Sequence, residues 1–351
     1  MIVRTLKLRL NKIQEKQLEQ WLWNLTGLYN WGLKKIEHDA KNKIFHSTFD
    51  FVNLIAEHSK KMEIPSHTMQ GTLQQAYNSW QRCFKKIAKK PRLKGQRNKL
   101  NSIPFPDSLR EPKNNKISVP GLGKVRFFKQ ELPNAKIKCG RILKKASGWY
   151  LCLWLDTNNK FLVKDTDKIV GIDPGFSTLL TLSDGTKIEN PRELRKGSKR
   201  LAQAQRGHSK KLVARLQEKQ ANRRNDRNHK ISRKLVENYK IIYYSDDNFK
   251  AMAKKFGKSV TEAGLGDLIN KTSYKSKVCG RTFKPVNSKF TTMTCSVCGA
   301  LTGPTGLAGL AVRHWGCSAC GAQHDRDLNS SHVVLNVGAG IAHEKELRYV
   351  A

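Results

Sequence analysis

The sequence predicts an α+β protein of several domains, in which a small β domain with a helical insertion precedes an α/β domain that carries a cysteine-rich ribbon. Apolar residues recur at helical spacing over the first quarter of the chain, and they alternate as in short strands from about residue 101 to 165. Buried-type strands separated by basic helices follow. At about 150 residues per domain, the 351 residues have room for two or more domains.

The N-terminal part predicts a strand followed by a basic helical lobe. Residues 1–10 alternate apolar and charged side chains, and we expect this strand to join the later β domain because it has no other obvious partner. Apolar residues at helical spacing from Leu18 to Ile36 and from Leu73 to Ile87 predict two amphipathic helices, the second ending before Pro91 among lysines. The helical lobe at 11–100 is then an insertion in a β domain made of 1–10 and 101–167.

The β domain is predicted from four short runs of alternating residues broken by Pro and Gly. Ser147 and Gly148 supply a turn between the last two runs. We expect a small barrel or sheet with strands at Lys116 to Val119, Lys124 to Phe128, Ala135 to Lys145 and Trp149 to Asp156.

A new domain is predicted from Lys168 onward. A buried-type strand ends at Asp173, and a hairpin turns at Asp184-Gly185. The stretch 194–240 predicts two helices with a cationic face, Ile241 to Tyr244 another buried strand, and Ala263 to Cys279 another helix. Such an α/β layout offers one active site at strand ends.

The charge predicts a polyanionic partner. The chain has 66 Lys+Arg against 28 Asp+Glu, a formal net charge of +38. A nucleic-acid duplex of about 20 bp presents roughly 40 phosphates, so the charge is of the right order to hold one. No apolar run approaches the roughly 18 residues of a membrane span, and the first residues lack a signal-peptide core, so we expect no membrane partner and a cytoplasmic location.

The clustered cysteines predict a structural zinc site. Two CxxC knuckles, Cys295-Ser-Val-Cys298 and Cys317-Ser-Ala-Cys320, are separated by eighteen residues, and a glycine follows each. Each knuckle places two thiolates on one turn, and two knuckles complete a tetrahedral four-cysteine site. A redox pair is the alternative, disfavoured by the matched knuckles; His314 and His324 are alternative ligands.

Two aspartates predict a divalent-metal site. Asp173 ends a strand before Pro174-Gly175, and Asp327 opens a helix after the ribbon. Each alone is typical of a turn former or a helix cap. Together they fit hydrolysis of a phosphodiester by two Mg²⁺ ions about 4 Å apart, which needs three or four converging carboxylates. An RNase-H-like sheet offers that geometry.

The chain resembles the TnpB family, which comprises the RNA-guided nucleases encoded by insertion sequences and is the ancestor of the CRISPR type V effectors. The resemblance spans essentially the whole chain, and the matching pieces occur in the family's order. They are Gly171-Ile-Asp-Pro-Gly175, Lys230-Ile-Ser-Arg-Lys-Leu-Val236, Gly280-Arg-Thr282, Thr294-Cys-Ser-Val-Cys-Gly299 and Asp325-Arg-Asp-Leu-Asn329.

The resemblance implies a β-barrel wedge domain with a helical recognition insertion, then a RuvC-type nuclease domain at 168–286 and 323–338. The zinc ribbon would occupy 287–322 and a tail 339–351. It also implies Mg²⁺-dependent cutting of double-stranded DNA that matches a guide RNA derived from the transposon end. By the same resemblance, Asp173 and Asp327 are the first and last catalytic carboxylates, and the basic stretch 192–240 lines the nucleic-acid channel.

The middle carboxylate departs from the family pattern, because Ser245 stands where the family has Glu. Serine is a poor Mg²⁺ ligand, so a nuclease-dead, RNA-guided DNA-binding repressor is the alternative function. If the chain is a nuclease, another residue must supply the middle catalytic carboxylate. Either Asp246 or Asp247 supplies it by a shift of register, or Glu262 reaches the site from the following helix. We favour Glu262, because Asp246 should face the other side of the sheet. The opposing interpretation of Glu262 is a solvated glutamate in a first helical turn.

Overall fold

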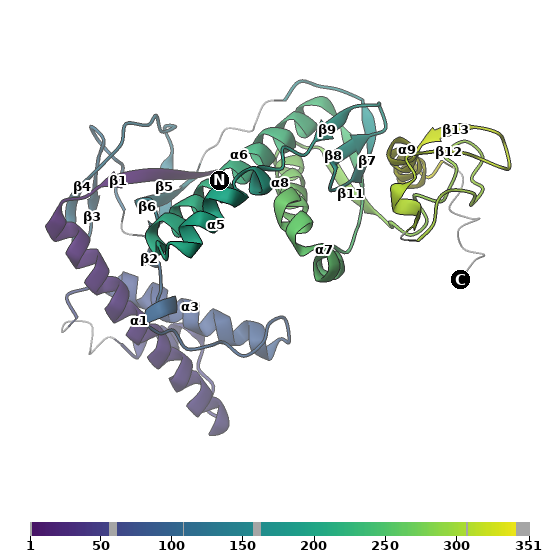
Figure 1. Ribbon diagram of the computed structural model, residues 1–351. Coiled ribbons are helices and arrows are strands. Elements are labelled where there is room, and N and C mark those ends of the chain that lie inside the picture. Colours follow the sequence, from purple (N-terminus) through teal and green to yellow (C-terminus); the bar gives the residue numbers. More distant parts are fainter. Residues whose placement is uncertain (1, 56–61, 108, 157–162, 307, 342–351) are drawn as a thin grey trace. The chain divides into compact units, whose positions relative to one another are not determined.

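The computed structural model describes residues 2–55, 62–107, 109–156, 163–306 and 308–341 (Figure 1). The chain divides into two compact units, Met1–Asn158 and Asn159–Ala351, and each has its own hydrophobic core. From residue 342 onward, the tail expected at 339–351 lies outside the described residues. The fold is mixed α+β, as the sequence predicts.

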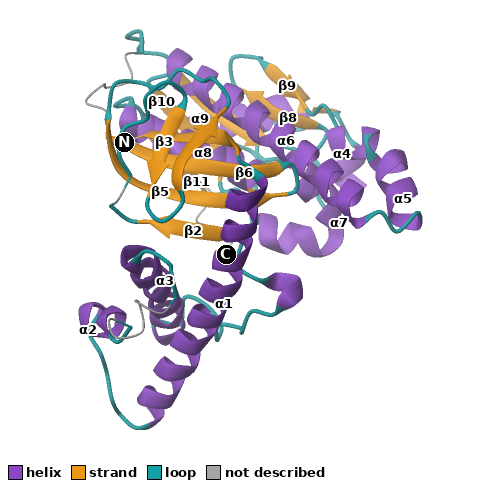
Figure 2. Ribbon diagram, turned by 90° about the vertical axis from the view of Figure 1, so that its left-hand side faces the viewer, coloured by secondary structure: helices purple, strands orange, loops and turns teal. Residues whose placement is uncertain are grey.

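The first unit contains a six-stranded sheet in the order β2-β5-β6-β1-β4-β3. The N-terminal strand joins it as predicted, since β1 pairs antiparallel with both β6 and β4. Figure 2 labels β2, β3, β5 and β6 of this sheet among the orange strands. The strand β2 was not predicted, because all four of its residues are buried and it shows no alternation. The strands are β1 (Ile2–Arg9), β2 (Ser102–Phe105), β3 (Lys116–Val119), β4 (Gly123–Phe127), β5 (Lys136–Lys145) and β6 (Gly148–Asp156).

In the described part of this unit, β1 is followed by the α-helices α1 (Lys12–Lys41), α2 (Thr48–Asn53) and α3 (Ser66–Phe84). A capping box between Asn11 and Gln14 starts α1. The predicted apolar stripes pack α1 against α3, which lie side by side in Figure 1. Gly32 permits the close approach, since a Cβ there would lie 3.0 Å from the Leu73 side chain. The lobe is thus held by the residues whose spacing predicts it.

The second unit contains a five-stranded sheet in the order β11-β10-β7-β8-β9. The strands β7, β10 and β11 are parallel, whereas β8 and β9 run antiparallel to their neighbours. The carboxyl ends of β7 and β10 therefore meet at one edge of the sheet. The strands are β7 (Ile169–Pro174), β8 (Thr178–Leu182), β9 (Lys187–Glu189), β10 (Ile241–Ser245) and β11 (Thr282–Val286).

The helices of this unit correct two predictions. The stretch 194–240, predicted as two helices, forms α4, α5 and α6, with breaks at Gly197 and at Gly207 to Ser209. The helix expected from Ala263 to Cys279 is only α8, and a separate helix, α7, precedes it and ends at Ala263. Gly264, with a φ of +62°, separates the two. The helices are α4 (Glu193–Lys196), α5 (Ser198–Arg206), α6 (Lys210–Asn238), α7 (Phe249–Ala263), α8 (Leu265–Val278) and α9 (Arg326–Ala339).

The cysteine-rich segment lies between β11 and α9. A two-stranded ladder, β12 (His314–Gly316) with β13 (Gln323–Asp325), carries the second knuckle in its loop and leads directly into α9. Among the described residues, no helix is long and apolar enough to cross a membrane.

Candidate active site and metal centre

The first predicted carboxylate, Asp173, lies at the carboxyl end of β7. The pairing of β7 with β10 extends to Ile172, and Asp173 pairs on its other side with Thr181 of β8. The central strand therefore fixes the backbone of Asp173. Its side chain projects at the edge where the parallel strands end.

The helix α9 brings Asp327 to the same region. Asp325 caps the helix by accepting a hydrogen bond from the N–H of Leu328, at 2.9 Å. The helix then crosses β7 at close range, since a Cβ on Gly171 would lie 2.2 Å from the carbonyl oxygen of Ser331. Only glycine permits this approach, so Gly171 sets the position of Asp327 relative to Asp173.

Two arginines hold the Asp327 carboxylate. Arg326 donates from Nη2 to Oδ1 at 2.7 Å, and Arg313 donates from Nη1 to Oδ2 at 3.2 Å. Neither arginine was identified from the sequence. The signal was present for Arg326, which lies between two aspartates in Asp325-Arg-Asp-Leu-Asn329.

A third carboxylate, Asp247, follows β10. Ser245 is the last residue of the strand and is 1% exposed, and the N–H of Asp246 extends the ladder to Val286. The chain then turns at Asp246, since the N–H of Asp247 donates to the carbonyl of Ser245 at 3.1 Å, and Asp247 is partly buried while Asp246 is exposed. A hydrogen bond from the Ser245 hydroxyl to Asp247 agrees with this placement.

The three aspartates interact electrostatically. Burial raises the pKa of Asp173 well above its usual range, and the charges of Asp247 and Asp327 raise it further, while Arg326 opposes them. Burial also raises the pKa of Asp247 to about 6, helped by Asp246 and opposed by hydrogen bonds from Ser288 and Ser245. A buried carboxyl group whose pKa is raised by two neighbouring carboxylates is typical of a site that a divalent cation neutralises.

Glu262 is placed differently from the expectation. It lies near the carboxyl end of α7 rather than in a first turn, and it is 4% exposed, so its interpretation as a solvated glutamate is wrong. Its Oε1 accepts the backbone N–H of Arg195 at 3.0 Å, and its Oε2 pairs with Nε of Arg195 at 3.2 Å. The charge of Glu262 also acts on Arg227. It is thus neutralised by arginines, and its role as a metal ligand stays a prediction.

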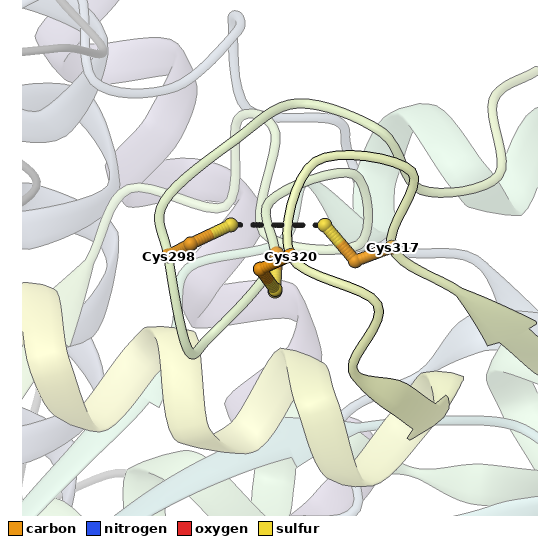
Figure 3. A group of neighbouring side chains, drawn as sticks. Cys298, Cys317 and Cys320 are labelled. Carbon is orange, nitrogen blue, oxygen red and sulfur yellow. Dashed lines mark hydrogen bonds between the residues drawn. The ribbon is translucent and has the colours of Figure 1, made fainter.

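The four predicted cysteines converge from two loops, three of them labelled in Figure 3. Their sulfur atoms lie within 4.8 Å of one another, with 3.6 Å between Cys298 and Cys317 and 3.7 Å between Cys295 and Cys320. Four thiolates about 2.3 Å from one tetrahedral ion would be about 3.8 Å apart, whereas a disulfide needs about 2.05 Å. The cluster can therefore bind a metal ion such as zinc.

The thiols of this cluster differ in their pKa: burial raises the pKa of Cys295, and contacts with the other thiols outweigh the Ala322 backbone hydrogen bond and raise that of Cys320, whereas that of Cys317 is lowered. Gly299 and Gly321 have φ values of +81° and +75°, which close the two knuckles as predicted. The hydroxyl of Thr302 donates to Sγ of Cys317 at 3.2 Å and lowers the pKa of that thiol. Of the two alternative ligands, His324 lies 3.0 Å from Sγ of Cys295, while His314 is exposed on β12.

A cationic surface follows the long helix α6, where the sequence predicts a nucleic-acid contact. Its lysines and arginines stand in solvent along most of the helix, while Ile231 and Leu235 hold its carboxyl half against the sheet. The exposed cations are Lys210, Lys211, Arg215, Lys219, Arg223, Lys230, Arg233 and Lys234.

Two family models match the second unit. The model described as "Probable transposase" matches residues 158–255, and the model described as "Cas12f1-like, TNB domain" matches residues 266–334. The first match contains Asp173 and Asp247, and the second contains the four cysteines and Asp327.

Curated relatives extend over most of the chain. A "Putative RNA-guided DNA endonuclease" of Streptomyces pristinaespiralis is 28% identical over 295 residues, which cover 79% of this chain and 72% of the relative. A "Putative RNA-guided DNA endonuclease InsQ" of Escherichia coli K12 is 24% identical over 307 residues, which cover 79% of this chain and 75% of the relative. A solved Cas12f1–sgRNA–target DNA complex contains a chain of similar fold, with a TM-score of 0.61 at 15% identity, over 93% of this chain and 83% of that one.

Proposed function

Because this chain belongs to the TnpB family of insertion-sequence proteins, we propose that it is an RNA-guided DNA endonuclease. It would cut double-stranded DNA that matches a guide RNA derived from the transposon end. The observation that carries the proposal is the cluster of Asp173, Asp247 and Asp327, in which the charges of the other two disfavour ionisation of the buried Asp173, a cost that a protein retains where a cation is to be bound. The nuclease-dead alternative is not favoured, since a binding protein has no need of this cluster.

We assign the second unit to a RuvC-type nuclease domain and the first to the wedge and recognition parts. The mixed sheet with parallel β7, β10 and β11, and with α9 against β7, supports the nuclease assignment. The sheet of the first unit supports the wedge assignment. Within the described residues no ladder joins its edge strands β2 and β3, so closure into a barrel belongs to the proposal. We place a structural zinc ion at the four cysteines.

Asp173, Asp327 and a third carboxylate would hold Mg²⁺, which when bound supplies a Lewis acid and lowers the pKa of a water molecule. We rank Asp247 first for the third position, because it is hydrogen-bonded to Ser245 and acts on Asp173. Glu262 stays the second candidate. To bind Mg²⁺, Glu262 would have to give up its ion pair with Arg195. Its side chain is longer than that of an aspartate and could extend farther toward the metal.

The residues of the chain have distinct roles in this proposal. Asp173 and Asp247 supply negative charge at the ends of two neighbouring strands, where a scissile phosphate approaches. Arg326 and Arg313 hold the Asp327 carboxylate, which like Glu262 would exchange an arginine for the metal ion. The exposed cations of α6 bind the backbone of the guide–target duplex, independently of its sequence.

The test is plasmid cleavage by the full chain, co-expressed with its flanking RNA and supplied with Mg²⁺. We expect Asp173→Asn and Asp247→Asn to lose at least about 100-fold in cleavage rate while guide-dependent binding persists. Glu262→Gln separates the two candidates, since it should keep cleavage if Asp247 is the ligand. Asp226→Asn, on an exposed turn of α6, is the matched control. Guide-dependent binding without cleavage by the unmutated chain would contradict the proposal and favour the repressor.

A further inference from the structure

Two asparagines of the C-terminal helix α9 hold the cysteine-rich segment. Asn329 accepts the backbone N–H of Ser296 through Oδ1 at 2.9 Å, and its Nδ2 donates to the carbonyl of Thr294 at 2.7 Å. Two turns further along the helix, Nδ2 of Asn336 donates to the carbonyl of Ser296 at 3.1 Å. We call Asn329 and Asn336 the asparagine clamp. It holds the backbone on both sides of Cys295, in the first CxxC knuckle.

The clamp places a polar side chain where a helix disfavours it. Asparagine is among the weaker helix formers, and a buried amide destabilises the fold unless its polar atoms are paired. Asn329 is nonetheless only 2% exposed within α9. Its hydrogen bonds offset that cost while the first knuckle keeps its shape. The placement of α9 therefore depends on the conformation of the cysteine-rich segment.

The opposite face of α9 lies against β7. Helical residues four apart share a face, so Asp327 and Ser331 lie on one face, while the asparagine clamp falls on the other. The carbonyl of Ser331 is the atom that a Cβ on Gly171 would meet, two residues before Asp173 in β7. The helix is thus a spacer between the cysteine-rich segment on one side and the aspartates on the other.

Arg313 forms a second link between the cysteine-rich segment and Asp327. Its carbonyl accepts the backbone N–H of Arg326 at 2.8 Å, and its Nη1 donates to Oδ2 of Asp327 at 3.2 Å. Arg313 directly precedes β12, which leads into Cys317 of the second knuckle. The segments of both knuckles are therefore connected to the helix turn that carries Asp327.

We propose that the asparagine clamp couples the four-cysteine site to the aspartate cluster, so that a metal ion on the cysteines raises the affinity of the aspartates for a divalent cation. A metal ion would fix the two knuckles relative to each other, and the clamp would pass this constraint to α9 and Asp327. Asn329 and Asn336 are positioning residues, because they act through Asp327. The inference rests on the proposed function, which assigns a cation to the aspartates.

The test measures binding of Mn²⁺ to the full chain by electron paramagnetic resonance of the free ion, with zinc content followed by native mass spectrometry. Removal of zinc by a chelator and dialysis should weaken Mn²⁺ binding to the unmutated chain by about 5- to 150-fold. Asn329→Ala should keep its zinc, bind Mn²⁺ more weakly by a similar factor, and lose little more when zinc is removed. Asp173→Asn measures the Mn²⁺ bound outside the cluster. Asn225→Ala, on an exposed position of α6, is the matched control and should behave like the unmutated chain.

A milder variant and a reciprocal measurement separate coupling from simple packing. Asn336→Ala removes a single hydrogen bond, so it should show a smaller loss, and it decides the matter if Asn329→Ala does not fold. Coupling between two binding sites is reciprocal, so Mn²⁺ should raise the zinc affinity of the unmutated chain by the same factor. Competition with a chromophoric chelator measures that affinity. A clamp that only stabilised the fold would not link the two affinities.

Three outcomes would overturn the proposal. The first is an unchanged Mn²⁺ affinity in zinc-loaded Asn329→Ala and Asn336→Ala. The second is an equal loss on zinc removal in the unmutated chain and in Asn329→Ala, and the third is loss of zinc from Asn329→Ala without Mn²⁺. If no Mn²⁺ site depended on Asp173, the metal cluster of the proposed nuclease would be refuted together with the coupling, whereas Mn²⁺ binding that ignores zinc would refute the coupling alone.

Discussion

Replacing Asp247 by asparagine should stabilise the metal-free protein while it impairs catalysis. Burial and the charge of Asp246 raise the pKa of Asp247 to about 6, against an ordinary value of 3.8. That difference corresponds to about 3 kcal/mol of free energy by which the ionised carboxylate destabilises the folded state. The asparagine side chain carries no charge, so this destabilisation would be absent from the variant.

The sign of the pH dependence follows from the direction of the shift. A carboxyl group whose folded-state pKa is raised destabilises the fold fully above that pKa, here about 6. The destabilisation fades as the pH falls toward the ordinary value of 3.8, because both states then hold the proton. The gain from Asp247→Asn should therefore approach about 3 kcal/mol near pH 7.5 and vanish near pH 4.

Hydrogen exchange of the β7 and β10 amides in EDTA measures this gain, since it reports the free energy of opening the sheet that carries Asp247. Asp226→Asn, an exposed aspartate paired with Lys230, is the control and should change protection little. Adding Mg²⁺ should increase protection in the unmutated chain but much less in Asp247→Asn. Lower protection of the variant in EDTA near pH 7.5 would refute the reasoning, because it would show that the charge is already compensated.

Three further predictions concern packing and the metal centre. Cys298→Ser should lower the bound zinc, measured by mass spectrometry of the native protein, and should reduce the melting temperature of the second unit; unchanged zinc content would contradict the four-cysteine site. Gly171→Ala should cost about 1–3 kcal/mol in urea unfolding and should reduce cleavage, because its Cβ would meet the carbonyl of Ser331 and displace α9. Tyr239→Phe should cost about 1.5–3 kcal/mol, since Asp184 loses a hydrogen bond of 2.5 Å; normal stability of that variant would show that water replaces the hydroxyl.

Much of the fold could be predicted from the sequence because its signals are local. The spacing of Leu18 to Ile36 and the alternation in residues 1–10 each follow from one element burying one face, and both elements form as predicted. The strand β2 was missed for the opposite reason, because all its residues are buried and it shows no alternation. The helix α7 was missed although apolar residues from Phe249 to Ala263 recur at helical spacing.

The sequence by itself determined the pieces of the site whose residue types and spacing carry the chemistry. Two CxxC knuckles imply a tetrahedral cluster because each is a single turn, and the strand-end Asp173 and helix-start Asp327 follow from local pattern. Only the tertiary structure ranks the candidates for the third carboxylate. The turn after β10 leaves Asp247 partly buried and hydrogen-bonded to Ser245, whereas an ion pair with Arg195 holds Glu262. The spacing of residues along the chain determines which side chains lie together within one helix or strand. How two elements pack together depends on close contacts between them, such as that of Gly171 with α9, and no local sequence pattern encodes such a contact.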